Sequence, residues 1–338
     1  MIEKIKLIFF LINNGIDNVY ILSPKSFYYF LPIIFRKIKF YAICINNINN
    51  YKRPNSFLRK FLFKYEVNDR EKVFKRESSR LIQNRLTSLK YYGLDKDFNI
   101  NVEEVRNQIT PNTKLMIINS PNNPCGSVIG LEELEELALL AKENDILVLS
   151  DEIYIRFLYE GSHQSIAALP DMMDRTIILD GFSKTYAMTG WRIGYGLFPE
   201  ELVEPVSRLV TNSVSCTASF TQMAAAEALV GSQDRPSAMV EEFKKRRDIV
   251  VAGLNSIEGI KCATPKGAFY AFPNIDGTGM SSAEFSNRLL EEAGVAVLAG
   301  ESFGKYGAGY IRLSFANSTE NLQEAISRIK QFLESNSS

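Results

Sequence analysis

The most constraining feature of the sequence is a series of short apolar runs that alternate with helical patterns. Three runs have the length of buried strands, at Lys114–Asn119, Ile146–Leu149 and Thr176–Leu179. Between the first two, leucines recur every three residues from Leu131 to Leu140, which is the spacing of one face of an amphipathic helix. Strands and helices that alternate in this way form a parallel sheet covered by helices on both faces. The pattern therefore predicts an α/β fold.

The pattern changes after about residue 238, which indicates a second domain. A long charged helix is expected at Val240–Leu254, and short strand and helix patterns are then mixed up to the C-terminus. We predict a three-layer α/β/α large domain with a mostly parallel sheet over residues 1–238. A smaller α+β domain is predicted over residues 239–338. Residues 46–90 fit no pattern, and we interpret them as an atypical insertion in the large domain.

Composition argues against several classes of function. The 39 Lys and Arg residues balance 39 Asp and Glu residues, so no excess charge points to nucleic acid. No apolar run approaches the roughly 20 residues of a membrane helix. The four cysteines are far apart, which argues against a zinc site or a disulfide framework and fits a reducing cytoplasm. Because His163 is the only histidine, we expect no metal site, and we assign no role to His163.

One lysine follows a predicted strand at the position where open α/β sheets bind ligands. Lys184 lies in the stretch DGFSKTYAMTGWRIG, just beyond the carboxyl end of the strand Thr176–Leu179. A lysine amine forms Schiff bases with carbonyl compounds when desolvation or a nearby cation makes it nucleophilic. Ser183 adds a hydroxyl group, and Arg192 adds a planar cation suited to a phosphate. A lone lysine in a loop is ordinarily just exposed, so the interpretation depends on the rest of the chain.

Three further motifs supply chemically matched groups. In NSPNNPCG, prolines and a glycine fix a turn in which Asn123 can donate hydrogen bonds. In SDEIY, Asp151 can hold a pyridinium nitrogen protonated, and Tyr154 can donate to a ring oxygen. In YIRLSF, Arg312 alternates with apolar residues, where its burial is costly unless it meets an anion. Taken singly, these features are equally explained as a turn, a helix cap at Asp151, and an arginine on the solvent face of an edge strand.

Together the groups match one small molecule with an aldehyde for Lys184, a pyridine nitrogen for Asp151, a phosphate for Arg192 and a carboxylate for Arg312. That molecule is pyridoxal 5'-phosphate with an amino acid bound. From about Tyr91 to the C-terminus, the sequence resembles the class I/II aminotransferases, which are fold type I pyridoxal phosphate enzymes of the aspartate aminotransferase-like type. The resemblance rests on the motifs SPNNPCG, SDEIY, GFSKTYAMTGWRIGYG and YIRLSF.

The resemblance implies roles around the cofactor ring. Lys184 is expected to be the catalytic residue, which carries the internal aldimine and moves the proton between the substrate Cα and the cofactor as a general acid and base. Asp151 is expected to contact the pyridine nitrogen. Tyr154 and Asn123 are expected to contact the ring oxygen, and Asn123 also lies where it would touch the substrate.

The resemblance also implies partners for the phosphate and the substrate. Ser183 and Arg192 would hold the phosphate, and Arg312 would bind the substrate carboxylate. Phe27, or Tyr28 beside it, would stack on the cofactor ring. The expected activity moves an amino group between an α-amino acid and a 2-oxo acid. The expected enzyme is a cytoplasmic homodimer with small-molecule substrates and no nucleic-acid or membrane partner.

The front of the chain departs from the family pattern. The N-terminal arm and the loop whose helix N-terminus binds the phosphate have no match, so we expect the chain to lack both. Cys125 stands where the family has a threonine in the NPTG turn. Two alternatives therefore stay open, a catalytically impaired relative with a weakened cofactor site and a related lyase. The substrate also stays open among dicarboxylate, aromatic and small aliphatic amino acids, and an aspartate-type or broad-range enzyme is favoured.

Overall fold

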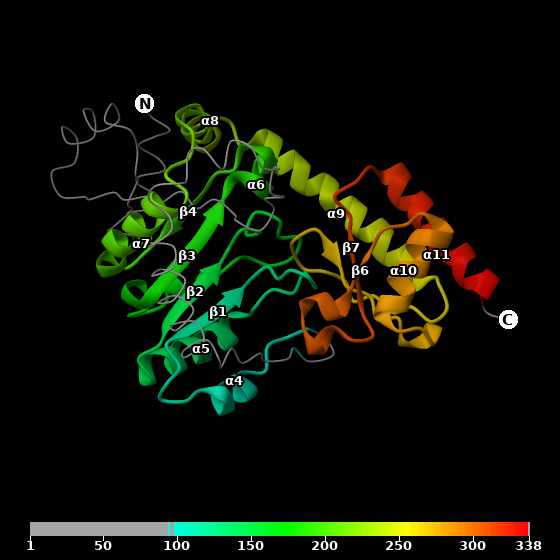
Figure 1. The fold of residues 1–338 in the computed structure, drawn as a ribbon, viewed down its shortest axis with the longest axis horizontal. Helices are drawn as coiled ribbons and strands as arrows, with labels where there is room; N and C mark the ends of the chain where they lie inside the picture. Colours follow the sequence, from blue (N-terminus) through cyan, green and yellow to red (C-terminus); the bar gives the residue numbers. More distant parts are fainter. Residues whose placement is uncertain (1–93, 95–97, 337–338) are drawn as a thin grey trace, which may run out of the picture. The chain divides into compact units, whose positions relative to one another are not determined.

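Two sheets organise the part of the chain that the structure describes (Figure 1). The structure is a computed structural model, and it describes Leu94 and residues 98–336. The first sheet has the strand order β1-β2-β3-β4, and the second has the order β5-β7-β6. The strands are β1 (Leu115–Asn119), β2 (Leu147–Asp151), β3 (Thr176–Gly181), β4 (Gly194–Leu197), β5 (Tyr270–Ala271), β6 (Leu298–Ala299) and β7 (Ile311–Ser314).

Helices connect the strands and follow them. They are α4 (Val102–Gln108), α5 (Leu131–Glu143), α6 (Phe182–Thr185), α7 (Glu200–Ser213), α8 (Ser219–Val230), α9 (Asp234–Asn255), α10 (Ser282–Ala293) and α11 (Thr319–Asn336). Within the described residues, no helix has both the length and the apolar character needed to cross a bilayer. Phe27 and the predicted insertion at 46–90 lie outside the described residues, as does the front of the chain, where the family's arm and phosphate loop had no match.

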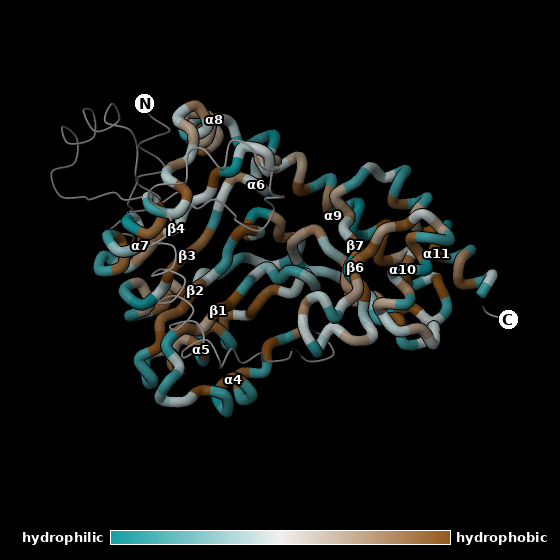
Figure 2. Tube along the Cα trace, viewed as in Figure 1, coloured by the Kyte–Doolittle hydropathy of each residue, from teal (hydrophilic) through white to brown (hydrophobic). Residues whose placement is uncertain are grey.

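The first sheet confirms the predicted α/β class. Strands β1, β2 and β3 are parallel, and β4 is antiparallel to β3. Helix α5 forms the crossover between β1 and β2, and its leucine stripe is buried as predicted at Leu134, Leu137 and Leu140. Figure 2 shows hydrophobic residues along the strands, whereas α4 and α5 alternate between hydrophobic and hydrophilic segments. The sheet thus packs its apolar residues against amphipathic helices.

Strand β1 differs from the prediction that it is buried on both faces. Met116 and Ile118 are buried, but Leu115 is 42% and Ile117 is 50% exposed. The alternation arises because successive side chains point to opposite faces of a strand. Among the described elements, none covers the face that carries Leu115 and Ile117. The continuous apolar run correctly predicted a strand, and among the described residues only one of its two faces is buried.

The chain between β3 and α8 also differs in detail from the sequence pattern. The apolar run Trp191–Leu197 becomes a strand only at Gly194. Arg192 is the reason, because its left-handed backbone (φ 55°, ψ 51°) ends the short helix η4 (Thr189–Trp191) and interrupts an extended chain. Helix α7, which follows β4, was not predicted.

The C-terminal part combines an antiparallel sheet with helices, as predicted for an α+β domain. Its core also contains Tyr154, Phe157 and Tyr159 from the segment after β2. The Phe157 ring lies edge-on to Phe243 of α9 with ring centroids 5.2 Å apart. Because α9 runs through residues 238 and 239, the predicted domain boundary falls inside a helix and stays a prediction.

Candidate active site

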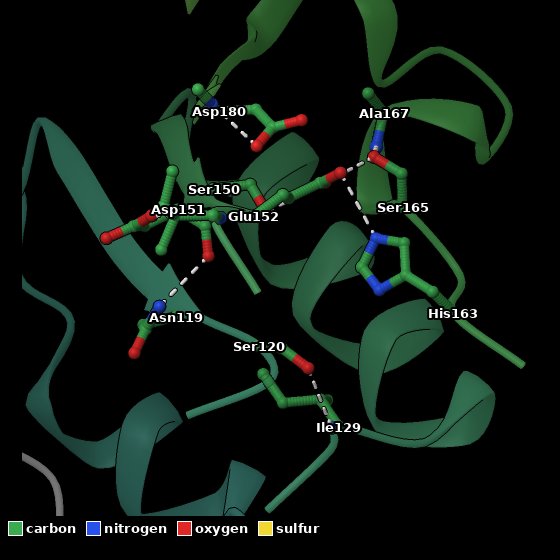
Figure 3. Close-up of polar contacts among 12 residues, drawn as sticks. Asn119, Ser120, Ile129, Ser150, Asp151, Glu152, His163, Ser165, Ala167 and Asp180 are labelled. Carbon is green, nitrogen blue, oxygen red and sulfur yellow. Dashed lines mark hydrogen bonds and ion pairs between the residues drawn. The ribbon is translucent and has the colours of Figure 1, made fainter. Parts of the chain in front are cut away.

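The carboxyl ends of β1, β2 and β3 place three polar segments at one edge of the sheet. In the strand register, Asn119 pairs with Asp151, and Asp151 pairs with Leu179. The side-chain amide of Asn119 also donates to the Asp151 carbonyl oxygen at 3.0 Å (Figure 3). Lys184 follows in α6, which begins directly after β3. The site therefore lies where parallel α/β sheets place their ligands.

Asp151 is a partly buried carboxylate at this edge. Its Oδ1 accepts a hydrogen bond from the Ile153 amide at 3.3 Å, which is a local turn and not a helix cap. Burial raises the pKa of Asp151, and the charge of Glu152 raises it further. The Ile153 hydrogen bond and the charge of Lys184 act in the opposite direction. A carboxylate in such surroundings gains most from a cationic partner.

Lys184 lies among aromatic rings and cations. Its Nζ is 5.7 Å from the centroid of the Tyr154 ring and 5.6 Å from that of Phe269. Burial lowers the pKa of Lys184, and the charges of Arg312 and Arg192 lower it further, whereas Asp151 raises it. The amine is therefore more readily neutral than a surface lysine, as a nucleophile or general base requires.

Arg312 is held in a fixed position. It lies on β7, the central strand of its sheet, so the alternative of a solvent-facing arginine on an edge strand is wrong. Its Nη1 donates to the Asn123 Oδ1 at 2.8 Å. The guanidinium carbon lies 4.5 Å from the Tyr270 ring centroid and 4.8 Å from that of Phe303. Rings on the guanidinium face leave its N–H edge available for a carboxylate.

The turn that carries Asn123 is fixed from both sides. The Asn123 amide donates to the Asn119 Oδ1 at 2.8 Å. Gly126 has a positive φ of 72°, and an added Cβ there would lie 2.6 Å from the Cβ of Pro265. The Gly267 amide donates to the Gly126 carbonyl at 2.9 Å. Glycine at these contacts lets the turn approach the segment that leads to β5. Because β5 pairs with β7, this close approach helps to bring Asn123 within hydrogen-bond distance of Arg312.

Cys125 fits the position where the family has a threonine. Its thiol lies 3.0 Å from the Asn122 Oδ1 and 3.2 Å from the Ser127 hydroxyl. Burial raises the pKa of this thiol, so it stays protonated and donates a hydrogen bond as a threonine hydroxyl would.

The predicted phosphate residues lie beside Lys184. Ser183 is the neighbouring residue in α6. Arg192 is exposed, donates from Nη1 to the Thr189 carbonyl at 2.9 Å, and is close enough to influence the charge of Lys184. It lines a hollow together with Trp191, Cys216, Thr217 and Phe220. Of the predicted site residues, only Phe27 falls outside the described part.

Tyr270 is a site residue that the sequence reasoning missed. Its hydroxyl lies 2.9 Å from the Tyr154 hydroxyl, and its ring lies under Arg312. It therefore links the predicted ring-oxygen donor to the predicted carboxylate-binding arginine. The segment GAFYAF combines three aromatic residues with small ones, which was the available signal.

Two Tyr270 variants should separate these contacts. Tyr270→Phe keeps the ring and loses one hydrogen bond, so we expect kcat to fall about two- to tenfold with little change in KM. Tyr270→Leu also loses the stacking on Arg312, so KM for amino acids should rise by a further ~3–10-fold. Steady-state kinetics would measure both effects. Tyr306→Phe on the exposed surface is the matched control, and equal KM values for the two Tyr270 variants would contradict the prediction.

Asp180, a carboxylate close to Asp151, is a second residue whose place beside the site the sequence reasoning did not predict. Its Oδ2 accepts a hydrogen bond from the Tyr195 hydroxyl at 2.5 Å, and its Oδ1 accepts one from the Gly181 amide at 2.6 Å. Burial raises the pKa of Asp180 from 3.8 to about 6, although both hydrogen bonds oppose the shift. The folded protein therefore binds this proton more tightly than the unfolded chain does.

Replacing Asp180 by asparagine should change how stability depends on pH. Because the pKa of Asp180 is raised on folding, the proton that it binds contributes stability to the folded state. This contribution is fully present below about pH 4 and is lost as the pH rises through about 6. Asp180→Asn should remove this slope and raise the unfolding free energy at pH 7 by up to about 3 kcal/mol. Urea denaturation followed by Trp191 fluorescence would measure it, with the exposed Asp174→Asn as control. An unchanged slope in Asp180→Asn would contradict the expectation.

Comparison with known proteins identifies the family. The profile described as "Aminotransferase class I and II" matches residues 78–329. The aromatic-amino-acid aminotransferase 2 of Thermococcus litoralis is 44% identical over 242 residues, which cover 71% of this chain and 62% of the relative. The aspartate aminotransferase of Pyrococcus abyssi is 45% identical over 244 residues, with the same coverage of 71% and 62%. The chain belongs to the class I and II aminotransferase family.

Solved structures agree with this assignment. The aromatic aminotransferase from Pyrococcus horikoshii has a TM-score of 0.68 and 43% identity, over 72% of this chain and 66% of that chain. The Thermus thermophilus aspartate aminotransferase with maleate has a TM-score of 0.66 and 39% identity, over 70% and 62%. The α/β fold is therefore that of the aspartate aminotransferases. The chain spans about 62% of the length of the first two relatives.

Proposed function

We propose that this protein is a pyridoxal phosphate-dependent aminotransferase that acts on an α-amino acid and a 2-oxo acid. The observation that carries the proposal is the set of charges around Lys184. Asp151, Arg192 and Arg312, which come from three separate motifs, all act on its amine. Each has the chemistry that a different part of the cofactor–substrate pair requires.

The residues present fit pyridoxal phosphate. Lys184, Arg192 and Arg312 are three cations that lie close together. Asp151 is the carboxylate whose charge acts on the pKa of Lys184 in the opposite direction to the arginines. Such an excess of positive charge suits a ligand with a phosphate and a carboxylate. Asp151 suits a protonated ring nitrogen, and the buried Tyr154 hydroxyl suits a ring oxygen. When bound, the cofactor supplies an aldehyde and a ring that accepts the electrons left at the substrate Cα.

The protein's own groups would then divide the work. The Lys184 amine would be the nucleophile that faces the cofactor aldehyde, and it would hold the proton removed from the substrate Cα. Arg312 would bind the α-carboxylate, while its hydrogen bond to the Asn123 Oδ1 holds the guanidinium in place. Asp151 would accept a hydrogen bond from a protonated ring nitrogen and so stabilise its positive charge. Ser183 and Arg192 donate to the phosphate.

The relatives support a substrate class. Those reported above are named as aspartate and aromatic-amino-acid aminotransferases, and one solved relative holds maleate, a dicarboxylate. In this chain, Phe303 and Tyr270 flank Arg312, and their rings suit an amino acid with an aromatic side chain. We propose a dicarboxylic or aromatic amino acid as the donor.

We also propose a homodimer in the cytoplasm. An apolar surface supports the dimer: Trp191, Phe220 and Met223 are 46%, 70% and 69% exposed, and the Trp191 and Phe220 ring centroids are 6.5 Å apart. Exposed apolar clusters of this kind are typical of interaction sites. The cytoplasmic location is supported by the free thiols of Cys125 and Cys262.

Absorbance titration with pyridoxal phosphate tests the proposal. A new band that borohydride reduction fixes to the protein, followed by peptide mapping of the label to Lys184, is the expected result. Aspartate, an aromatic amino acid and alanine, added one at a time before reduction, should then bleach the band to different extents. No band at saturating cofactor would contradict the proposal and favour an impaired relative.

A further inference from the structure

A buried polar network lies directly behind Asp151. Glu152 is 4% exposed and accepts three side-chain hydrogen bonds (Figure 3). Its Oε1 accepts from the Ser165 hydroxyl at 2.6 Å and the Ser150 hydroxyl at 3.1 Å, and its Oε2 lies 3.1 Å from the His163 Nε2. A buried carboxylate needs such donors, because an unsatisfied one is costly.

The hydrogen bond to Glu152 indicates which ring nitrogen of His163 is the donor. Because an ionised carboxylate only accepts, the N–H is assigned to the His163 Nε2. The His163 Nδ1 is buried and has no hydrogen-bond partner among the described residues. The Ser165 hydroxyl also accepts from the Ala167 amide at 3.4 Å, which starts the short helix η2 (Ile166–Ala168). The loop that carries His163 is thereby tied to β2.

Glu152 and Asp151 extend to opposite sides of the chain. Figure 3 shows the Asp151 carboxylate turned away from the Glu152 side chain, as expected for neighbours at a strand end. Ser150 lies on the Glu152 side and bonds to it. The Glu152 amide also donates to the Leu179 carbonyl at 2.8 Å, which ties this point of β2 to β3. Anchoring Ser150 and Glu152 therefore sets the direction in which Asp151 points.

We propose that Glu152, His163 and Ser165 are positioning residues that aim the Asp151 carboxylate at a cationic ring nitrogen. The inference rests on the proposed function, because only a ligand with such a nitrogen uses the direction of Asp151. Asp151, Asp180 and Tyr195 lie close enough to Glu152 that its negative charge raises their pKa values. The hydrogen bonds from His163, Ser150 and Ser165 hold the Glu152 carboxylate in place, although its charge still opposes ionisation of Asp151.

The test measures the ring-nitrogen contact apart from activity. Pyridoxamine phosphate and its 1-deaza analogue, in which carbon replaces the ring nitrogen, are bound to the full chain, and Trp191 fluorescence gives both dissociation constants. Their ratio reports the contact of Asp151 with the nitrogen. For the unaltered protein we expect a ratio of roughly 10–100, as for a hydrogen bond to a charged group. Asp151→Ala should bring the ratio to about 1.

Variants of the network should lower the same ratio. Glu152→Ala and His163→Phe are expected to reduce it about three- to tenfold, by letting the Asp151 carboxylate turn. Glu152→Gln, which keeps the shape and the serine contacts, should retain most of the discrimination. Ser165→Ala is a milder change for use if His163→Phe does not fold. Ser120→Ala is the matched control, since this buried hydroxyl directly follows strand β1 and accepts a hydrogen bond from the Ile129 amide at 3.1 Å instead of contacting Glu152.

The outcomes separate the inference from the proposed function. A ratio near 1 in the unaltered protein would overturn the ring-nitrogen role of Asp151 and the inference with it. A high ratio that stays unchanged in Glu152→Ala, His163→Phe or Ser165→Ala would overturn the inference alone. In that case the network would be purely structural, even if these variants bound both ligands more weakly.

Discussion

Replacing Lys184 by alanine is expected to abolish amino transfer, with kcat reduced by at least about 10⁴-fold. The estimate combines the loss of a general acid and base with the loss of the nucleophile. Lys184 is the lysine whose amine lies beside Tyr154, within the influence of Asp151 and both arginines. A coupled assay of 2-oxo acid formation would measure the loss.

Binding without covalent chemistry should survive the change. Asp151, Tyr154 and Arg192 remain in place, so the dissociation constant of pyridoxamine phosphate should stay within about tenfold of that of the unaltered protein. Lys184→Arg keeps a cation but no usable nucleophile, and it should be as inactive as alanine. Lys245→Ala on the exposed side of α9 serves as the control. Turnover by Lys184→Ala within about 100-fold of normal would show that another group does the chemistry.

The parts of the site that follow strands were predictable from the sequence. Asp151 and Lys184 come directly after apolar runs, and the carboxyl ends of parallel strands meet at one edge of a sheet. The motifs around them supplied the residue types that one cofactor requires. Short-range pattern was therefore enough to identify these residues and to predict that they lie close together.

Contacts between distant segments were not predictable in this way. Arg312 and Asn123 are 189 residues apart, and Tyr154 and Tyr270 are 116 apart, so neither contact has a signature in local periodicity. The central position of β7 depends on pairing with β5 and β6. The sequence around His163 showed no motif. His163 reaches Glu152 only because the loop between them folds back toward the end of β2. Packing, and not propensity, decides such contacts.

Replacing Arg312 by leucine is the second change with a large expected effect. Arg312 is partly buried, and removing one partner of such a hydrogen-bonded charge pair costs about 2–5 kcal/mol, so kcat/KM for α-amino acids should fall by about 10²–10³-fold. Arg312→Lys keeps the charge but loses the planar fork and the stacking between Tyr270 and Phe303, so a loss of about 10–100-fold is expected. Steady-state kinetics with several amino acids would measure both.

A primary amine without a carboxylate supplies the internal control for Arg312. Because such an amine offers Arg312 no partner, its poor kcat/KM should change by less than about threefold in Arg312→Leu, whereas that of amino acids collapses. Cofactor affinity should also stay constant, since Arg312 is assigned to the substrate. Arg328→Leu on α11, where the arginine pairs with Glu324 at the surface, controls for the loss of a charge. If amine and amino acid lost activity equally, Arg312 would be maintaining the site as a whole, and its assignment to the substrate carboxylate would be wrong.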